Sequence, residues 1–246
     1  MKFNLLLLYL GSYLCGGIPF GVVFAKMKGV DLLKVGSGNI GATNVKRALG
    51  TKFAYIVFVL DVAKAAVPAY AAKFVIDQPY FGLPAQVFWI LAGLFAVFGH
   101  CVSPFLRFKG GKGVSTALGM VVGAAPPVAA CGFGLFLVLL FATRYMSLAS
   151  LIAVSSSIVT GWFLPGQARE LLPLYILLSV FVALRHRPNI TRLLEGTEPR
   201  FSINETKNPD LDSSNKSTRE AQEELPTDID LEPPNTEGNS SDATPG

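Results

Sequence analysis

Residues 3–25 read FNLLLLYLGSYLCGGIPFGVVFA, an uninterrupted run without a charged side chain. The hydrocarbon core of a bilayer is about 30 Å thick, so roughly 20 apolar residues cross it as a helix. The run is long enough, and it lacks the small-x-small cleavage site of a signal peptide. We therefore expect a retained membrane-spanning helix over residues 3–25.

Later segments repeat this apolar pattern, three of them at spanning length and a fourth slightly shorter. They are residues 53–75, 85–105, 147–164 and 171–184. Residues 114–143 form a longer block that Ala124-Ala125-Pro126-Pro127 interrupts, and consecutive prolines end a helix. We interpret this block as two helices, the first of which (114–125) crosses only if its neighbours or local thinning of the bilayer accommodate it.

The fold class that follows is all-α, a polytopic membrane protein of about seven transmembrane helices, with five as the alternative. The composition agrees, since 51% hydrophobic and 15% charged residues are too apolar a balance for a soluble domain of this length. The loops on one side of the predicted bundle carry 14 Lys and Arg residues, and those on the other side carry one. The positive-inside rule then predicts an outside N-terminus and a cytoplasmic C-terminus.

The net charge of the sequence changes from positive to negative near residue 203. Residues 1–203 hold 18 basic and 6 acidic side chains, whereas residues 204–246 hold 3 and 11. The second part is rich in Asn, Ser, Thr and Pro, and it has too little apolar surface to offset the entropy of ordering. We predict a multi-helix transmembrane domain over residues 1–203 and a disordered acidic tail over 204–246.

The first basic loop is rich in glycine. It reads Gly36-Ser37-Gly38-Asn39-Ile40-Gly41-Ala42-Thr43-Asn44, followed by Lys46 and Arg47. The glycines match G-x-G-x-x-G, but a dinucleotide site needs a preceding buried strand, and here a spanning helix precedes the loop. Glycines still let the backbone approach an anion, and hydroxyls, amides and a cation supply donors. A phosphate cradle and a simple membrane-surface turn both remain open.

The second basic loop reads Phe108-Lys109-Gly110-Gly111-Lys112-Gly113 and opens the short helix. It is not a nucleotide-binding P-loop, because Gly113 stands where that motif needs Ser or Thr for magnesium. Free backbone N–H groups and a point charge at a helix N-terminus nevertheless favour anions. The loop is thus a second candidate phosphate site.

Two further stretches carry polar side chains on the same side. Ser147 and Ser150 lie one turn apart at a helix start, where N-capping by Ser147 is the alternative to a binding role. Residues 185–198 follow the last helix, and topology alone explains their arginines but not His186 and Asn189. Inside the second helix, the Asp61 and Lys64 side chains are expected to pair structurally or to line a site.

Together and in order, these loops resemble the bacterial acyl-phosphate:glycerol-3-phosphate acyltransferase family. The match rests on Gly36 to Asn44 with Arg47, on Gly99-His100 with Phe108 to Gly113, on Ser147-Leu148-Ala149-Ser150, and on Arg185-His186 with Asn189 and Glu198. The resemblance implies a seven-helix enzyme of the bacterial inner membrane with its site at the cytoplasmic face. It would transfer a fatty acyl group from acyl phosphate to the 1-hydroxyl of glycerol 3-phosphate, giving lysophosphatidic acid for phospholipid biosynthesis.

The resemblance also assigns site residues. The catalytic set it implies is Ser37, Arg47, Lys112, His186 and Asn189. The substrate-binding set it implies is Asn39, Gly41, Thr43, Asn44, Gly110, Gly111, Gly113, Ser147, Ser150 and Glu198. We expect Lys112 to bind the acyl phosphate and Arg47 the glycerol 3-phosphate, while the general base is either His186 or a substrate phosphate.

No metal and no cofactor is expected, because the sequence has no C-x-x-C, no H-E-x-x-H and no cluster of carboxylates. The expected partners are the two substrates and membrane lipid, without nucleic acid; a monomer is favoured and the oligomeric state is left open. The alternative function is a transporter for an organic phosphate or an anionic lipid. A transporter usually shows internal repeats and broken helices at the midplane, whereas the glycine-rich stretches here gather on one face.

Overall fold

The computed structural model describes residues 2–201, and the regular structure within that range is helical. The helices are α1 (Lys2–Gly17), α2 (Phe20–Met27), α3 (Ala42–Leu49), α4 (Thr51–Val75), α5 (Ala85–Cys101), η1 (Pro104–Leu106), α6 (Val114–Ala124), α7 (Pro126–Thr143), α8 (Met146–Phe163), η2 (Arg169–Leu171), α9 (Leu172–Arg185) and α10 (Arg187–Leu194). The predicted acidic tail, residues 204–246, lies outside the described residues.

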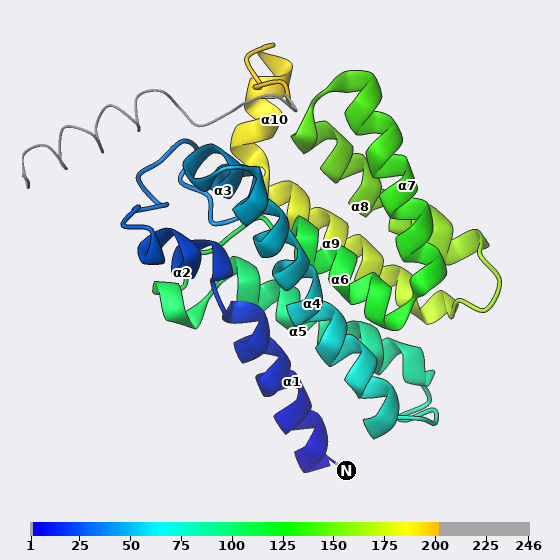
Figure 1. The fold of residues 1–246 in the computed structure, drawn as a ribbon. Coiled ribbons are helices and arrows are strands. Elements are labelled where there is room, and N and C mark those ends of the chain that lie inside the picture. The colour runs from blue at the N-terminus through cyan, green and yellow to red at the C-terminus, as the bar shows by residue number, and fades with distance from the viewer. Residues whose placement is uncertain (1, 202–246) are drawn as a thin grey trace, which may run out of the picture. The chain divides into compact units, whose positions relative to one another are not determined.

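The longer helices lie alongside one another and reverse direction at each connection (Figure 1). The short helices α3 and α10 gather at one end, and the N-terminus lies at the other. The loops that precede α3, α6 and α8 and the segment that follows α9 therefore meet at the same end. The first two are the basic, glycine-rich loops that the sequence singled out, and the last two carry its two further polar stretches.

The interpretation of residues 114–143 as two helices is confirmed. Helix α6 ends at Ala124, Ala125 is not helical, and α7 begins at Pro126. Proline is tolerated in the first turn of a helix because its missing N–H has no partner there anyway. The same two prolines therefore end one helix and start the next.

The prediction of one continuous helix over residues 3–25 was wrong in its middle. Helix α1 ends at Gly17, and α2 starts at Phe20 after a break at Ile18 and Pro19. Proline cannot donate a backbone hydrogen bond, and hydropathy alone does not register that loss. The Ile18 carbonyl instead accepts a hydrogen bond of 2.8 Å from the Lys64 ammonium group.

Within residues 2–201, four helical segments are long and apolar enough to cross a membrane: residues 4–27, α4, α7 and α8. A fifth arises if the segment 169–185 and α10, bent by 68°, count as one span. Helices α5 and α6 are apolar but shorter, at 17 and 11 residues. Large apolar side chains such as Leu6, Val67 and Phe163 are exposed on the bundle, as expected where lipid is the solvent. The protein is an all-helical integral membrane protein.

Helices α4 and α6 pack closely because the contact consists of small residues. A Cβ atom added at Gly119 would overlap the Val62 carbonyl, and one added at Gly123 would overlap the Ala66 carbonyl. Small residues let two helix backbones approach within a membrane, where packing rather than hydrophobicity drives association. The contact holds the start of α6, and with it the second basic loop, beside α4.

We predict that Gly119→Ala destabilises the protein, because its methyl group must displace a neighbouring backbone. Overpacking of this kind costs about 1 to 3 kcal/mol, which thermal unfolding in detergent would detect as a lower Tm. The matched control is Gly134→Ala in α7, where no atom lies within 4 Å of the added Cβ. Equal melting temperatures for the two variants would contradict this packing.

Candidate active site

A cavity of about 480 Å³ lies between the basic loops and the ends of the helices they connect. This size is typical of pockets that bind small molecules. Of the predicted site residues, those that line it are Ser37, Asn39, Gly41, Thr43, Asn44, Arg47, Lys112, Gly113, Ser147, Ser150, His186, Asn189 and Glu198. Gly110 and Gly111 are not in the lining. The fold thus brings together residues from loops far apart in the sequence.

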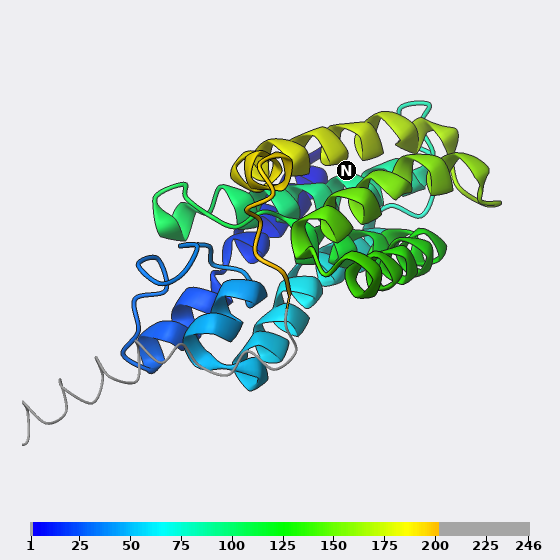
Figure 2. The ribbon, with the colours of Figure 1, turned by 90° about the horizontal axis from the view of Figure 1, so that it is seen from above.

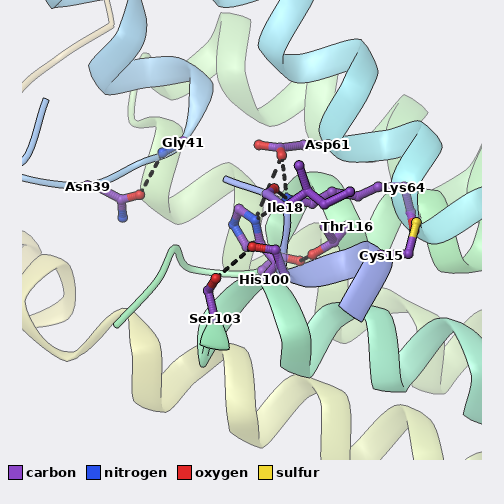
Figure 3. Close-up of polar contacts among 11 residues, drawn as sticks. Cys15, Ile18, Asn39, Gly41, Asp61, Lys64, His100, Ser103 and Thr116 are labelled. Carbon is purple, nitrogen blue, oxygen red and sulfur yellow. Dashed lines mark hydrogen bonds and ion pairs between the residues drawn. The ribbon is translucent and has the colours of Figure 1, made fainter. Parts of the chain in front are cut away.

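Two asparagine side chains fix the conformation of the first loop by hydrogen bonds to its backbone. The buried Asn44 side chain donates from Nδ2 to the Leu32 and Val35 carbonyls at 3.2 and 3.0 Å, and its Oδ1 accepts from Ser37 N at 3.1 Å. Asn39 Oδ1 accepts from Gly41 N at 2.9 Å (Figure 3). Both were predicted to bind substrate, and the structure places both in the cavity wall with hydrogen bonds that fix the loop. Ser37 and Thr43 are exposed beside them.

Hydrogen bonds from Arg185 hold the second loop in place. Arg185 donates from Nη2 to the Gly110 carbonyl at 2.9 Å and from Nε to the Gly111 carbonyl at 3.1 Å. Gly111 N donates to the His100 carbonyl at 3.0 Å. The sequence attributed Arg185 to membrane topology alone, but the structure shows that it braces the loop. No local signal indicates this contact, because 74 positions separate Arg185 from Gly111.

Glu198 organises the segment after α9. Its carboxylate accepts from Asn189 Nδ2 at 2.7 Å and from Arg192 Nε at 2.8 Å. Burial raises the pKa of Glu198, but hydrogen bonds that include these two outweigh burial and hold the pKa below its ordinary value. Ser147 also lies close enough to the Glu198 carboxylate to help lower its pKa. Among the described residues, Asn189 Oδ1 is buried at the cavity wall without a hydrogen-bond partner. Such an atom is free to bind a ligand.

The His186 ring has a defined orientation. Its Nδ1 lies 2.8 Å from the Val182 carbonyl, so Nδ1 is the protonated nitrogen and Nε2 is the acceptor. Burial, the main cause, lowers the pKa of His186 to about 4. The ring is therefore neutral at pH 7 and is a weak base.

Lys112 lies among other charges. Burial lowers its pKa to about 8, Glu198 opposes the shift, and the cations Arg192, Arg47 and Arg185 add to it. Because the pKa of a lysine has been lowered, its positive charge is present at neutral pH and is lost as the pH rises through 8. A phosphate group bound beside it would favour the charged form.

Asp61 and Lys64 form the expected buried ion pair, and of the two only Asp61 is in the cavity lining. Lys64 Nζ lies 2.7 Å from Asp61 Oδ1, and Asp61 also lines the cavity, as does His100 (Figure 3). Sequence reasoning did not select His100 or Arg192 as site residues. Nor did it select the apolar part of the wall, which includes Phe58 and Phe133.

The chain crosses the end of the bundle once more after α10. Seen from above, this last described segment extends from α10 across the ends of other helices (Figure 2). The Phe201 N–H donates to the Arg144 carbonyl, and the Lys46 ammonium lies 4.6 Å from the centre of the Phe201 ring. Phe201 also lines the cavity, so this segment covers part of it.

The chain is similar to known glycerol-3-phosphate acyltransferases. The family model for glycerol-3-phosphate acyltransferase matches residues 6–196. The glycerol-3-phosphate acyltransferase of Aquifex aeolicus is 46% identical over 198 residues, which are 80% of this chain and 98% of the relative. That of Geobacter sulfurreducens is 40% identical over 201 residues, with coverage of 80% and 98%.

This chain belongs to the glycerol-3-phosphate acyltransferase family. Solved structures of an integral membrane glycerol 3-phosphate acyltransferase, PlsY, have the same fold. Its glycerol 3-phosphate form aligns with a TM-score of 0.73 at 44% identity, and its lysophosphatidic acid form with 0.72 at 43%. Each alignment covers 81% of this chain and 96% of the solved one.

For this member of the acyltransferase family, we predict that catalytic efficiency falls as the pH rises above about 8, because Lys112 then loses its charge. Lys112→Ala should lower kcat/KM about ten- to a hundredfold, the effect of one charge-assisted hydrogen bond. Lys112→Arg should lose much activity through its bulk, but its residual rate should not fall between pH 7 and 9. Initial rates measured between pH 7 and 9 give both the loss of kcat/KM and its pH dependence.

Lys109→Ala is the control, since the Lys109 side chain is exposed and outside the cavity lining. Its kinetics and pH profile should match those of the wild type. An equal loss in the two alanine variants, or an alkaline fall that persists in Lys112→Arg, would contradict the assignment to Lys112.

Proposed function

We propose that this protein transfers a fatty acyl group from acyl phosphate to the 1-hydroxyl of glycerol 3-phosphate, forming lysophosphatidic acid and inorganic phosphate. The observation that carries the proposal is one cavity with a cationic polar wall and an apolar wall. Both substrates carry a phosphate group, and the acyl donor also carries a hydrocarbon chain. The family and the solved PlsY complexes support the acceptor and the product.

The two phosphates have separate binding groups in this proposal. Arg47 lines the cavity from α3, and its planar fork suits the bidentate geometry of glycerol 3-phosphate. Lys112 lines the cavity from the second loop, where it supplies a compact charge to the acyl phosphate. Gly113, with φ 88°, ends the loop in a conformation that glycine adopts without strain.

The acyl chain has an apolar place in the same cavity. Phe58, Phe133 and Phe136 line its wall, and a smaller apolar pocket of about 70 Å³ shares these three residues. That pocket continues between α6, α7 and α8 toward Val121 and Ala129. A chain held there leaves its phosphoryl end at the basic loops.

The chemistry needs no covalent enzyme intermediate, because an acyl phosphate contains a good leaving group. The acceptor hydroxyl oxygen attacks the acyl carbon; the new C–O bond forms, the bond from that carbon to the phosphate oxygen breaks, and phosphate leaves. Positioning and charge neutralisation by the fixed cations lower the barrier.

The hydroxyl proton passes to a phosphate oxygen in this proposal. A phosphate monoester has a second pKa of about 6, so its dianion is a stronger base than His186, whose pKa is about 4. Before the attack, the hydroxyl donates its one hydrogen bond to His186 Nε2 or to the unpaired Asn189 Oδ1, either of which can orient it. Ser37, Ser147 and Ser150 supply further hydroxyl groups at the wall.

We place the active site at the cytoplasmic face of the bacterial inner membrane, in a catalytic domain of residues 1–203 that crosses the membrane seven times. The supporting observation is that the basic loops and α10 share one end of the bundle (Figure 1). A reporter fused after Phe201 should therefore be cytoplasmic, and a tag before Met1 should be outside. Finding both termini on one side would exclude seven crossings.

The donor is tested directly with purified protein. We expect turnover of palmitoyl phosphate with glycerol 3-phosphate, and at least a hundredfold slower turnover of palmitoyl-CoA that is free of acyl phosphate. Product and released phosphate are measured together, since the proposed reaction forms them in equal amounts. Comparable rates with the two donors would refute the donor assignment, and no consumption of either would favour the transporter alternative.

A further inference from the structure

A buried lysine behind the cavity-lining residues Asp61 and His100 uses all three of its hydrogen-bond donors. Lys64 Nζ lies 2.7 Å from Asp61 Oδ1, 2.8 Å from the Ile18 carbonyl and 3.0 Å from His100 Nδ1 (Figure 3). An ammonium group has three N–H donors and no acceptor, so it matches three acceptors. His100 Nδ1 must then be the unprotonated nitrogen. The neutral His100 ring accordingly carries its proton on Nε2.

The protonated side of the His100 ring lies at the second basic loop. A Cβ atom at Gly111 would overlap His100 Nε2, so the absence of a side chain at Gly111 is what leaves room for the ring. His100 is 3% exposed and lines the cavity. Within residues 2–201, the only hydrogen bond of its ring is the one to Lys64. The Nε2–H group is thus a donor without a partner at the loop that carries Lys112.

Structural stability alone does not account for this arrangement. Removing charged groups from water is costly, and replacing a buried ion pair with apolar residues is often neutral or stabilising. Asp61 and Lys64 are each no more than 4% exposed. A buried charge pair beside a cavity can instead fix the tautomer of a neighbouring histidine. An ammonium group that donates a hydrogen bond to a ring nitrogen requires that nitrogen to be unprotonated, so only one tautomer fits.

We propose that His100 is a further substrate-binding residue, in which Lys64 fixes the Nε2–H tautomer and Nε2–H donates a hydrogen bond to a phosphate oxygen of the acyl phosphate. The inference rests on the proposed function, because it assigns His100 to the same donor phosphate as Lys112. A neutral imidazole can stabilise developing negative charge as a hydrogen-bond donor without giving up its proton. His186, which lines the same cavity, has the opposite tautomer, with its proton on Nδ1.

The tautomer can be measured without any activity. The sequence contains only two histidines, so 15N-histidine labelling gives a two-residue NMR spectrum. We expect His100 to be protonated on Nε2 and His186 on Nδ1, with assignment from the spectrum of His100→Asn. Adding inorganic phosphate should shift the His100 Nε2 and Hε2 signals. Protonation of His100 on Nδ1, or signals unmoved by saturating phosphate, would overturn the proposal.

Two amide variants separate the two nitrogens of His100. His100→Asn places an amide near Nδ1, where its oxygen can still accept from Lys64, but it has no donor near Nε2. His100→Gln reaches the position of Nε2 and can donate there. Loss of a hydrogen bond to a charged acceptor should raise KM for acyl phosphate about ten- to a hundredfold in His100→Asn. His100→Gln should recover at least tenfold of that loss, and KM for glycerol 3-phosphate should stay within twofold in both.

Thermal unfolding of both variants is the structural control. The matched variant is Ser12→Ala, a buried polar change in α1 outside the cavity lining. Wild-type kinetics in His100→Asn, an equal defect in both amide variants at equal Tm, or a KM change confined to glycerol 3-phosphate would each refute the role of His100. A wild-type protein that does not consume acyl phosphate would refute the proposed function instead. The phosphate titration by NMR would then still decide whether His100 binds phosphate.

Discussion

The Lys64 ammonium group is the interaction on which the arrangement of the site depends. It lies on α4, yet its acceptors include a carbonyl at the break between α1 and α2 and a ring nitrogen on α5. Within a lipid-embedded bundle, a backbone carbonyl at a break between two helices must find a donor inside the protein. Lys64 supplies that donor, and Asp61 balances its charge. One side chain thereby joins three helices at the depth of the cavity.

The glycine-rich loops depend on the same frame. The His100 ring, held by Lys64, occupies the space that Gly111 leaves empty, and the carbonyls of Gly110 and Gly111 accept from Arg185 of α9. The glycines therefore serve partly to let other groups approach the loop from behind. This differs from the simple view that each glycine faces the anion. The loop is a rigid support from which Lys112 lines the cavity.

Charge in the cavity is arranged so that the cations keep their charge and the imidazoles stay neutral. Glu198 is ionised and lies among arginines, which limits their repulsion of Lys112. His186 is neutral and presents an acceptor nitrogen. The proposed reaction requires both properties, since phosphates need fixed positive charge and the attacking hydroxyl needs an acceptor. Phe58 and Phe133 form an apolar part of the same cavity wall.

The sequence by itself determined that the protein is a helical membrane protein with its polar loops on one side, because hydropathy and proline act locally. It also predicted the two helices within residues 114–143, and 13 of the 15 site residues that its short motifs indicated line the cavity. It did not predict the contact of Lys64 with the Ile18 carbonyl, the bracing by Arg185 or the place of His100. These depend on contacts between residues 46, 74 and 36 positions apart. Only the packed tertiary structure decides which buried donor meets which acceptor, because that choice is set by distance in space and not by any local pattern.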